Sequence, residues 1–238
     1  MLASGAAFAQ PPTFNWTGFY IGLNAGGAST GIDHDLTVPA ITRFPARAFA
    51  SGDRDVSFTG GFLAGYNLLF APNWLAGIEG DINYLRASHQ SNFAFFNNGE
   101  DVVGTQNTRL RWLATVRGRL GYTWANTLVY ATGGVAFGGV RSNVDAIRCF
   151  GVCTDAVFAG SYSATRAGWT VGGGLQQALT NWMWLRIEYL HFDLGSFSYD
   201  VNRVSGTVSQ NVPNTWLANG QVSGDIVRAA VIVRLGPP

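Results

Sequence analysis

Eight segments of this chain alternate large apolar side chains with small or polar ones, residue by residue. A period of two places one kind of side chain on each face of a β-strand, whereas an amphipathic helix repeats every 3.6 residues. The eight segments cover residues 18–27, 57–68, 74–86, 109–122, 127–140, 167–177, 182–192 and 225–235. We therefore predict an all-β chain with eight strands.

The connections between these segments alternate in length. Three are short and cover residues 69–73, 123–126 and 178–181. The other four are long and mostly polar, and cover residues 28–56, 87–108, 141–166 and 193–224. Such long loops are uncommon in compact soluble domains but typical of the surface side of outer-membrane barrels. The pattern predicts an eight-stranded antiparallel transmembrane β-barrel with short periplasmic turns and four long extracellular loops.

The composition favours a surface that meets lipid. Charged residues make up 12% of the chain, about half of the roughly 25% usual in soluble domains. The sequence contains no stretch of 18 apolar residues that would predict a transmembrane helix. A closed barrel is the other structure that satisfies the hydrogen-bonding groups of the backbone in lipid. The net charge of +1 argues against a nucleic-acid partner, which would require a basic excess.

The N-terminal residues indicate export. Ala7-Phe8-Ala9 has the small-x-small pattern of a signal-peptidase site. We interpret residues 1–9 as a signal-peptide remnant and residues 10–238 as the barrel domain. The alternative is an alanine-rich disordered tail.

Charged side chains gather on the faces opposite the apolar ones. An eight-stranded barrel has room inside only for side chains, so charges there must be paired. The predicted interior network comprises Glu79, Asp81, Arg109, Arg111, Arg117, Arg119, Arg186, Glu188 and Arg228. We predict an ionic plug that makes the barrel rigid; the alternative is a narrow, gated, water-filled path with a slight anion preference.

Aromatic side chains lie near the ends of the predicted strands, where membrane barrels carry two aromatic girdles. The predicted girdle residues are Tyr66, Trp74, Tyr84, Tyr122, Trp124, Trp182 and Tyr189. The alternative interpretation treats them as ordinary strand residues of a soluble sandwich. That alternative does not explain why they gather at strand ends.

Few residues suggest other chemistry. Cys149 and Cys153 could form a disulfide in an exported protein or remain free thiols, and they have too few neighbouring ligands for a metal site. His191, Asp193 and Ser196 could supply a base, its orienting group and a nucleophile. Because no oxyanion site accompanies them, we interpret them as polar rim residues and predict neither an enzyme nor a cofactor.

Several segments carry a family resemblance. They are W-T-G-F-Y-I-G-L-N-A-G-G (16–27), G-G-F-L-A-G-Y-N (60–67), W-L-A-G-I-E-G-D-I (74–82), R-G-R-L-G-Y (117–122), V-Y-A-T-G-G-V-A (129–136) and W-L-R-I-E-Y-L (184–190). Together they resemble small outer-membrane β-barrel proteins of alphaproteobacteria, which include the major surface antigens of Brucella and the haem-binding proteins of Bartonella and share an OmpA-like barrel.

The resemblance implies an integral protein of the Gram-negative outer membrane with a structural or surface role and at most weak porin activity. Its expected partners are outer-membrane lipid, lipopolysaccharide and, during insertion, the barrel-assembly machinery. Since a closed barrel has no free edge to pair, we expect a monomer. The alternative is a surface ligand-binding protein that holds haem or another small molecule in its loops, with His34 or His89 as the haem ligand.

Overall fold

The computed structural model describes residues 14–38, 47–97, 100–150, 152–206 and 215–236. The predicted signal remnant, residues 1–9, lies outside this range. The strands are β1 (Gly18–Val38), β2 (Arg47–Ala71), β3 (Trp74–Asn97), β4 (Glu100–Trp124), β5 (Thr127–Phe150), β6 (Val152–Ala178), β7 (Met183–Gly206) and β8 (Thr215–Leu235). Within the described residues no helix is long and apolar enough to cross a membrane.

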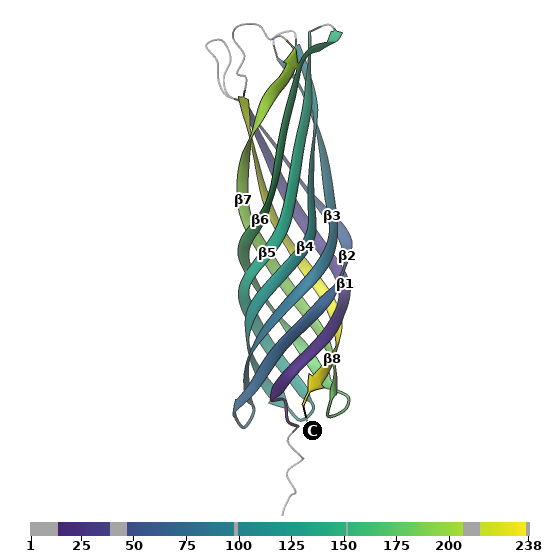
Figure 1. Cartoon of the computed structure of the whole chain (residues 1–238), viewed down its shortest axis with the longest axis vertical. Coiled ribbons are helices and arrows are strands. Elements are labelled where there is room, and N and C mark those ends of the chain that lie inside the picture. Colours follow the sequence, from purple (N-terminus) through teal and green to yellow (C-terminus); the bar gives the residue numbers. More distant parts are fainter. Residues whose placement is uncertain (1–13, 39–46, 98–99, 151, 207–214, 237–238) are drawn as a thin grey trace, which may run out of the picture.

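The eight strands close into one barrel (Figure 1). Each strand pairs antiparallel with the next, and β1 also pairs with β8 from Phe19 opposite Leu235 to Thr37 opposite Leu217. The predicted all-β fold of eight antiparallel strands is confirmed. The ladder is continuous toward the ends of the strands that meet the short turns, where its backbone groups are satisfied without water. Toward the opposite end it is interrupted, because the pairing of β2 with β3 stops at Thr59 and Leu85, and the register of β6 with β7 breaks between Ala159 and Trp169.

Short connections gather at one end of the barrel, which we call the turn end. There, residues 72–73, 125–126 and 179–182 join β2 to β3, β4 to β5 and β6 to β7. Backbone hydrogen bonds tie neighbouring turns together, from Thr123 N–H to the Asn73 carbonyl and from Ala178 N–H to the Asn126 carbonyl, both at 2.8 Å. These turns match the short connections predicted from the sequence.

The prediction of four long loops at the opposite end, the far end, is wrong. Most of those residues continue the strands, so that only residues 98–99 separate β3 from β4 and only residue 151 separates β5 from β6. In the extensions much of the outer face is polar, as at Arg86, Ser88 and Gln90, although apolar residues such as Val103 and Val204 are exposed there too. A strand with a polar outer face loses the apolar alternation by which the other segments were recognised.

The phase of side chains in β4 reverses within the strand. Arg117 and Leu113 face the interior, and simple alternation would then turn Leu110 and Thr108 outward. Both of these residues are instead buried inside, and the register of β4 with β5 shifts between Leu110 and Leu113. Such a bulge adds one residue to one strand and turns every later side chain to the other face. Arg109 is therefore exposed on the outer face instead of lying inside.

The interior is filled in three layers. At the turn end lies an apolar layer, the turn-end core, which comprises Trp16, Tyr20, Leu63, Leu75, Leu128, Tyr130, Ala178, Trp184, Ala230 and Ile232. A larger apolar layer, the far core, fills the barrel further along and includes Leu85, Leu113, Leu190, Phe192 and Ile226. Charged residues separate the two, as the order along β7 shows: Trp184, Arg186, Glu188 and Leu190 all face inward.

Candidate functional site

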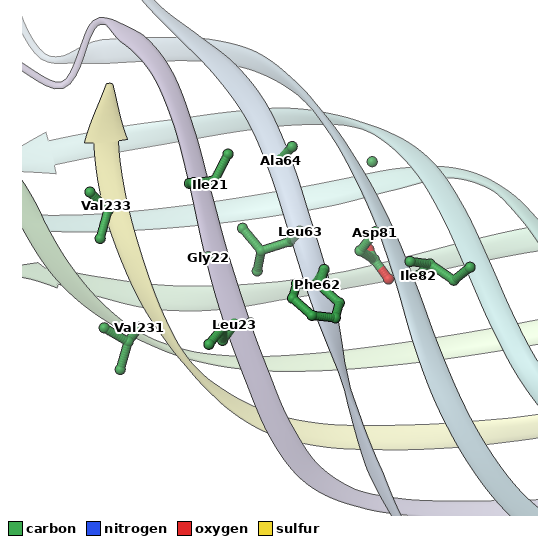
Figure 2. A pocket seen from close by; sticks show the side chains of 11 residues that line it. Ile21, Gly22, Leu23, Phe62, Leu63, Ala64, Asp81, Ile82, Val231 and Val233 are labelled. Carbon is green, nitrogen blue, oxygen red and sulfur yellow. The ribbon is translucent and has the colours of Figure 1, made fainter. Parts of the chain in front are cut away.

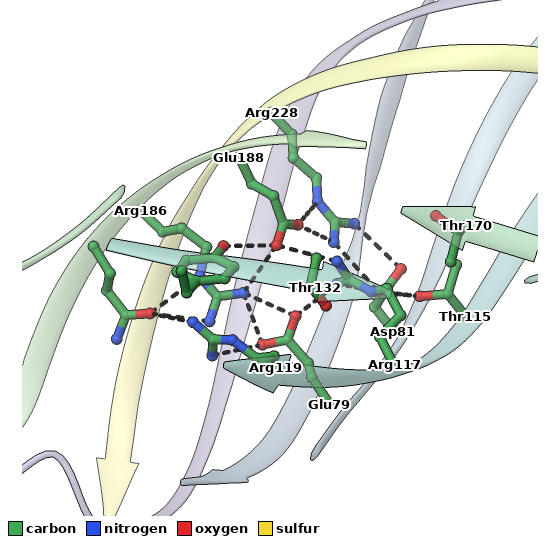
Figure 3. A network of polar contacts seen from close by, with 12 residues as sticks. Glu79, Asp81, Thr115, Arg117, Arg119, Thr132, Thr170, Arg186, Glu188 and Arg228 are labelled. Carbon is green, nitrogen blue, oxygen red and sulfur yellow. Dashed lines mark hydrogen bonds and ion pairs between the residues drawn. The ribbon is translucent and has the colours of Figure 1, made fainter. Parts of the chain in front are cut away.

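Seven charged side chains meet between the two apolar layers and form what we call the charge cluster (Figure 3). They come from four strands. They are Glu79 and Asp81 of β3, Arg117 and Arg119 of β4, Arg186 and Glu188 of β7, and Arg228 of β8. Each is buried, and Asp81 is the most exposed at 7%. All seven belong to the interior network predicted from the sequence.

Arg117 lies at the centre of the cluster. Its guanidinium donates to Glu79 at 2.7 Å, to Asp81 at 2.8 Å and to Glu188 at 3.1 Å. Its Nε also donates to the hydroxyl of Thr115 at 3.0 Å. Hydrogen bonds between ionised groups are about twice as strong as neutral ones. One arginine thus links the carboxylates of β3 to the carboxylate of β7.

The remaining arginines complete the pairing. Arg186 lies 2.7 Å and Arg119 lies 3.3 Å from the carboxylate of Glu79. Arg228 donates to Glu188 at 2.6 Å and to Asp81 at 3.2 Å. Every carboxylate in the cluster is therefore held by at least two guanidinium groups, which is the arrangement that buried charges require.

Two tyrosines join the cluster, although the sequence prediction of its members considered only charged residues. The hydroxyl of Tyr20 donates to Glu79 at 2.7 Å, and that of Tyr130 donates to Glu188 at 2.6 Å. The Tyr130 ring also stacks beneath Arg119, with 3.9 Å between the guanidinium carbon and the ring centroid. The available signal was strand alternation, which places both tyrosines on inward-facing positions. The cluster holds one more arginine than carboxylates, and the Tyr130 ring faces the positive charge of Arg119.

The other two predicted members lie outside the barrel. Arg109 and Arg111 are exposed on the outer face, because the bulge between Leu110 and Leu113 reverses the phase of β4. Arg109 donates from Nε to the side chain of Asn107 at 3.0 Å, also on the surface. The prediction that these two arginines contribute to the interior is therefore wrong.

The outer surface carries an apolar band with aromatic residues at both edges. At the turn-end edge, Trp74 and Tyr122 pack edge to face with 5.4 Å between ring centroids, and Trp124 is 82% exposed. Tyr84 and Tyr189 lie at the opposite edge. All seven predicted girdle residues are exposed or half-buried, and Tyr66 packs against Phe19 with 4.7 Å between ring centroids.

Within the band the surface is uneven. Small residues such as Gly22, Ala64 and Gly80 lie between the exposed side chains of Ile21, Phe62 and their neighbours, which leaves a shallow apolar groove over β1, β2, β3 and β8 (Figure 2). The groove has almost no polar lining. Such a surface suits the acyl chains of lipids.

The other residues singled out from the sequence are separated by the fold. The side chains of Cys149 and Cys153 lie outside those that the structure describes. His191 Nδ1 lies 2.9 Å from Asp225 of β8, and Asp193 instead accepts a hydrogen bond from the backbone of Gly195 at 2.7 Å. The histidine–aspartate arrangement that the sequence analysis considered and set aside does not form, because His191 contacts Asp225 instead of Asp193.

His34 and His89 do not lie in loops, contrary to the sequence interpretation. Both point into the barrel, 3% and 6% exposed, and their rings stack with 5.8 Å between centroids. Burial, with the neighbouring His89, lowers the pKa of His34 from 6.5 to about 4. Among the described residues, no three His, Cys, Asp or Glu side chains gather to hold a metal ion.

The barrel is expected to lose stability as pH falls from about 6.5 to about 4. Unfolded His34 regains its ordinary pKa of 6.5, so in this window the unfolded chain binds the proton more readily than the folded chain, whose His34 pKa is about 4. Urea-unfolding midpoints measured across this window should fall less steeply for His34→Leu than for the natural chain. The matched control, Thr30→Val, removes a buried polar group from the same face of β1 and should keep the natural slope. An equal slope for His34→Leu would contradict the expectation.

Comparison with known proteins agrees with this architecture. Residues 1–212 match the family described as "Outer membrane protein beta-barrel domain". The 31 kDa outer-membrane immunogenic protein of Brucella melitensis is 36% identical over 204 residues, which cover 81% of this chain and 77% of that protein. The 22 kDa outer membrane protein of Rhizobium leguminosarum is 29% identical over 205 residues, which cover 84% and 73%.

A solved structure shows the same fold. The outer membrane protein OprG from Pseudomonas aeruginosa matches with a TM-score of 0.55 at 12% identity, covering 93% of this chain and 97% of that one. The predicted resemblance to the Brucella surface antigens and the predicted location in the outer membrane are both confirmed. The chain belongs to the outer membrane protein beta-barrel domain family and is an integral β-barrel of the bacterial outer membrane.

Proposed function

We propose that this barrel is a structural protein of the outer membrane that presents its far end at the cell surface and conducts no solute. The observation that supports this is the charge cluster between two apolar layers. Its seven side chains pair with one another instead of lining a water-filled path. Short turns lie on the periplasmic side in this class of barrel, so the strand extensions of the far end project from the cell.

Conduction would require the layers to open. A hydrated ion that entered from the turn end would have to pass Trp16 and Trp184, both 0% exposed and packed with 5.2 Å between ring centroids. It would then meet guanidinium groups already bonded to carboxylates, and beyond them the far core. Breaking a buried charge pair costs about 3–5 kcal/mol, which disfavours even brief opening.

The same features argue against catalysis inside the barrel. A general acid or base must reach the substrate within hydrogen-bond distance, and the carboxylates of Glu79 and Glu188 are enclosed by their arginine and tyrosine partners. We therefore propose an anchoring and surface role without an enzymatic step.

Planar-bilayer recordings test the proposal. The refolded full chain is expected to show no discrete conductance steps, while a known porin prepared in the same way shows them. Folding before the recording is checked by a shift in migration between unboiled and boiled samples on an SDS gel. Reproducible steps from protein that shows the shift, absent from detergent blanks, would overturn the closed-barrel proposal.

A further inference from the structure

Four exposed arginines gather on the outer face of β3, β4 and β5, and we call them the arginine patch: Arg86, Arg109, Arg111 and Arg141. The strand register places them together. Arg109 lies directly opposite Arg141, and Ser88 lies opposite Arg109. The register of β3 with β4 is irregular between Tyr84 and Ala87, and Arg86 lies in this stretch of β3 while Arg111 lies in the facing stretch of β4. Neighbouring strands are about 4.8 Å apart, so the four guanidinium groups can reach a shared ligand.

The patch lies immediately above the apolar band. The next outward residues toward the turn end are Tyr84 and Trp112, which are paired with each other. Tyr84 is 60% exposed and belongs to the aromatic edge of the band. Aromatic residues of this kind mark the depth of the headgroups in a membrane. With the far end outside the cell, as proposed above, the patch lies at the headgroups of the outer leaflet.

The patch has four positive charges and one neighbouring carboxylate, that of Asp55, which accepts a hydrogen bond from the backbone N–H of Ser88 at 3.4 Å. Within the described part of the chain, the salt bridges include none of these four arginines. Their outward neighbours on the same strands are uncharged and include Ser88, Gln90, Asn107 and Asn143. Like charges placed opposite each other across strands are destabilising, and Arg109 and Arg141 are so placed. An anion from outside the chain would remove this cost.

The bulge in β4 is what creates the patch. Without the extra residue between Leu110 and Leu113, Arg109 and Arg111 would point into the barrel. Bulges are features that re-aim side chains. The outer face of β7 and β8 near the same edge differs, because Asp225 there accepts from Tyr189 and lies 3.9 Å from Arg54. The excess positive charge is thus confined to one side of the barrel.

We propose that the arginine patch binds the phosphate groups of a phosphorylated glycolipid in the outer leaflet, of the lipid A type. Guanidinium groups form paired hydrogen bonds with phosphate, and the acyl chains of the same molecule would lie on the apolar band below. The site does not depend on whether the barrel conducts, so its failure and that of the closed-barrel proposal are separate results.

The test uses the full chain refolded in lipid-free detergent micelles. Binding of bisphosphorylated lipid A, dephosphorylated lipid A and inorganic phosphate is measured by native mass spectrometry and by the shift in melting temperature. We expect bisphosphorylated lipid A to bind most tightly and more weakly as salt rises. Equal binding of dephosphorylated lipid A would overturn the phosphate contact, and an equal shift with inorganic phosphate would overturn the lipid as its source.

The variants locate the site. The quadruple variant R86Q/R109Q/R111Q/R141Q should bind bisphosphorylated lipid A at least tenfold more weakly. The matched control, Arg54→Gln, removes an exposed arginine that has Asp225 in reach at 3.9 Å and should change affinity less than twofold. Equal losses in both would overturn a specific patch.

Stability without lipid provides an independent measurement. In lipid-free micelles the quadruple variant should melt at the same temperature as the natural chain or higher, because like-charge repulsion has been removed. The double variants R86Q/R111Q and R109Q/R141Q each retain half of the patch and serve if the quadruple variant refolds poorly. Unchanged lipid A affinity in both doubles would overturn the proposal.

Discussion

Replacing Glu79 with glutamine is expected to remove about 3–5 kcal/mol from the free energy of unfolding, as breaking a buried charge pair does. Glu79 accepts hydrogen bonds from Tyr20, Arg117 and Arg186, and Arg119 lies 3.3 Å away. Glutamine keeps the volume of the side chain but loses the negative charge. Three arginines would then share a neutral group in a buried site, and the excess of positive charge would grow.

Urea titrations of the chain refolded in lipid vesicles, followed by tryptophan fluorescence, measure this loss. The matched control is Asp35→Asn, the same acid-to-amide change at an exposed position of β1, which should alter the free energy by less than about 0.5 kcal/mol. A loss below 1 kcal/mol for Glu79→Gln would show that the charge cluster contributes little to stability.

Replacing Gly134 with valine is expected to prevent most of the protein molecules from folding. Gly134 of β5 lies opposite Arg117 of β4. A Cβ atom there would lie 2.1 Å from the carbonyl oxygen of Val116 and 2.7 Å from the Cα of Arg117. Both atoms belong to the backbone, so a change of rotamer cannot relieve the contact. Overpacking of this kind costs about 3 kcal/mol or more, and it would also displace the central arginine of the cluster.

The neighbouring glycine provides the control. A Cβ atom on Gly133 would lie 3.6 Å from its nearest neighbour, the carbonyl oxygen of Thr170, which is ordinary contact. Gly133→Val should therefore fold as well as the natural chain, since valine is favoured in strands. The folded fraction is read from unboiled SDS gels. Equal folded fractions for the two variants would contradict the close backbone approach at Gly134.

Much of the fold could be predicted because lipid imposes a simple pattern. Wherever a strand crosses the hydrocarbon layer of the membrane, its outward residues must be apolar. The contrast with the residues that face the barrel interior gives a clear period of two. This holds for Ile187 and Tyr189, which face outward on either side of the buried Glu188. Beyond the membrane the outer face is largely polar, while apolar residues such as Ile32, Val144 and Trp216 face inward, so the pattern of the crossing segments no longer applies. The signal then weakens, and the extensions were predicted as loops.

The charge cluster was partly predictable for the same reason. Seven of its predicted members followed from alternation within a crossing segment, while Arg109 and Arg111 were assigned to the wrong face. Nothing in Arg109-Leu110-Arg111-Trp112-Leu113 marks the bulge. Large apolar residues stand at both odd and even positions of this segment, so it fits a strand equally well with or without an extra residue. The uncharged partners Tyr20 and Tyr130 could be placed inside, but their hydrogen bonds could not be foreseen.

The sequence by itself determined the number of strands, the short turns and the band that meets lipid, because these depend on local alternation and on connection length. Only the tertiary structure decided which carboxylate each arginine binds, how far the strands extend and on which face two arginines of β4 lie. Those features depend on the register between strands, and one inserted residue is enough to exchange the inside and the outside of everything beyond it.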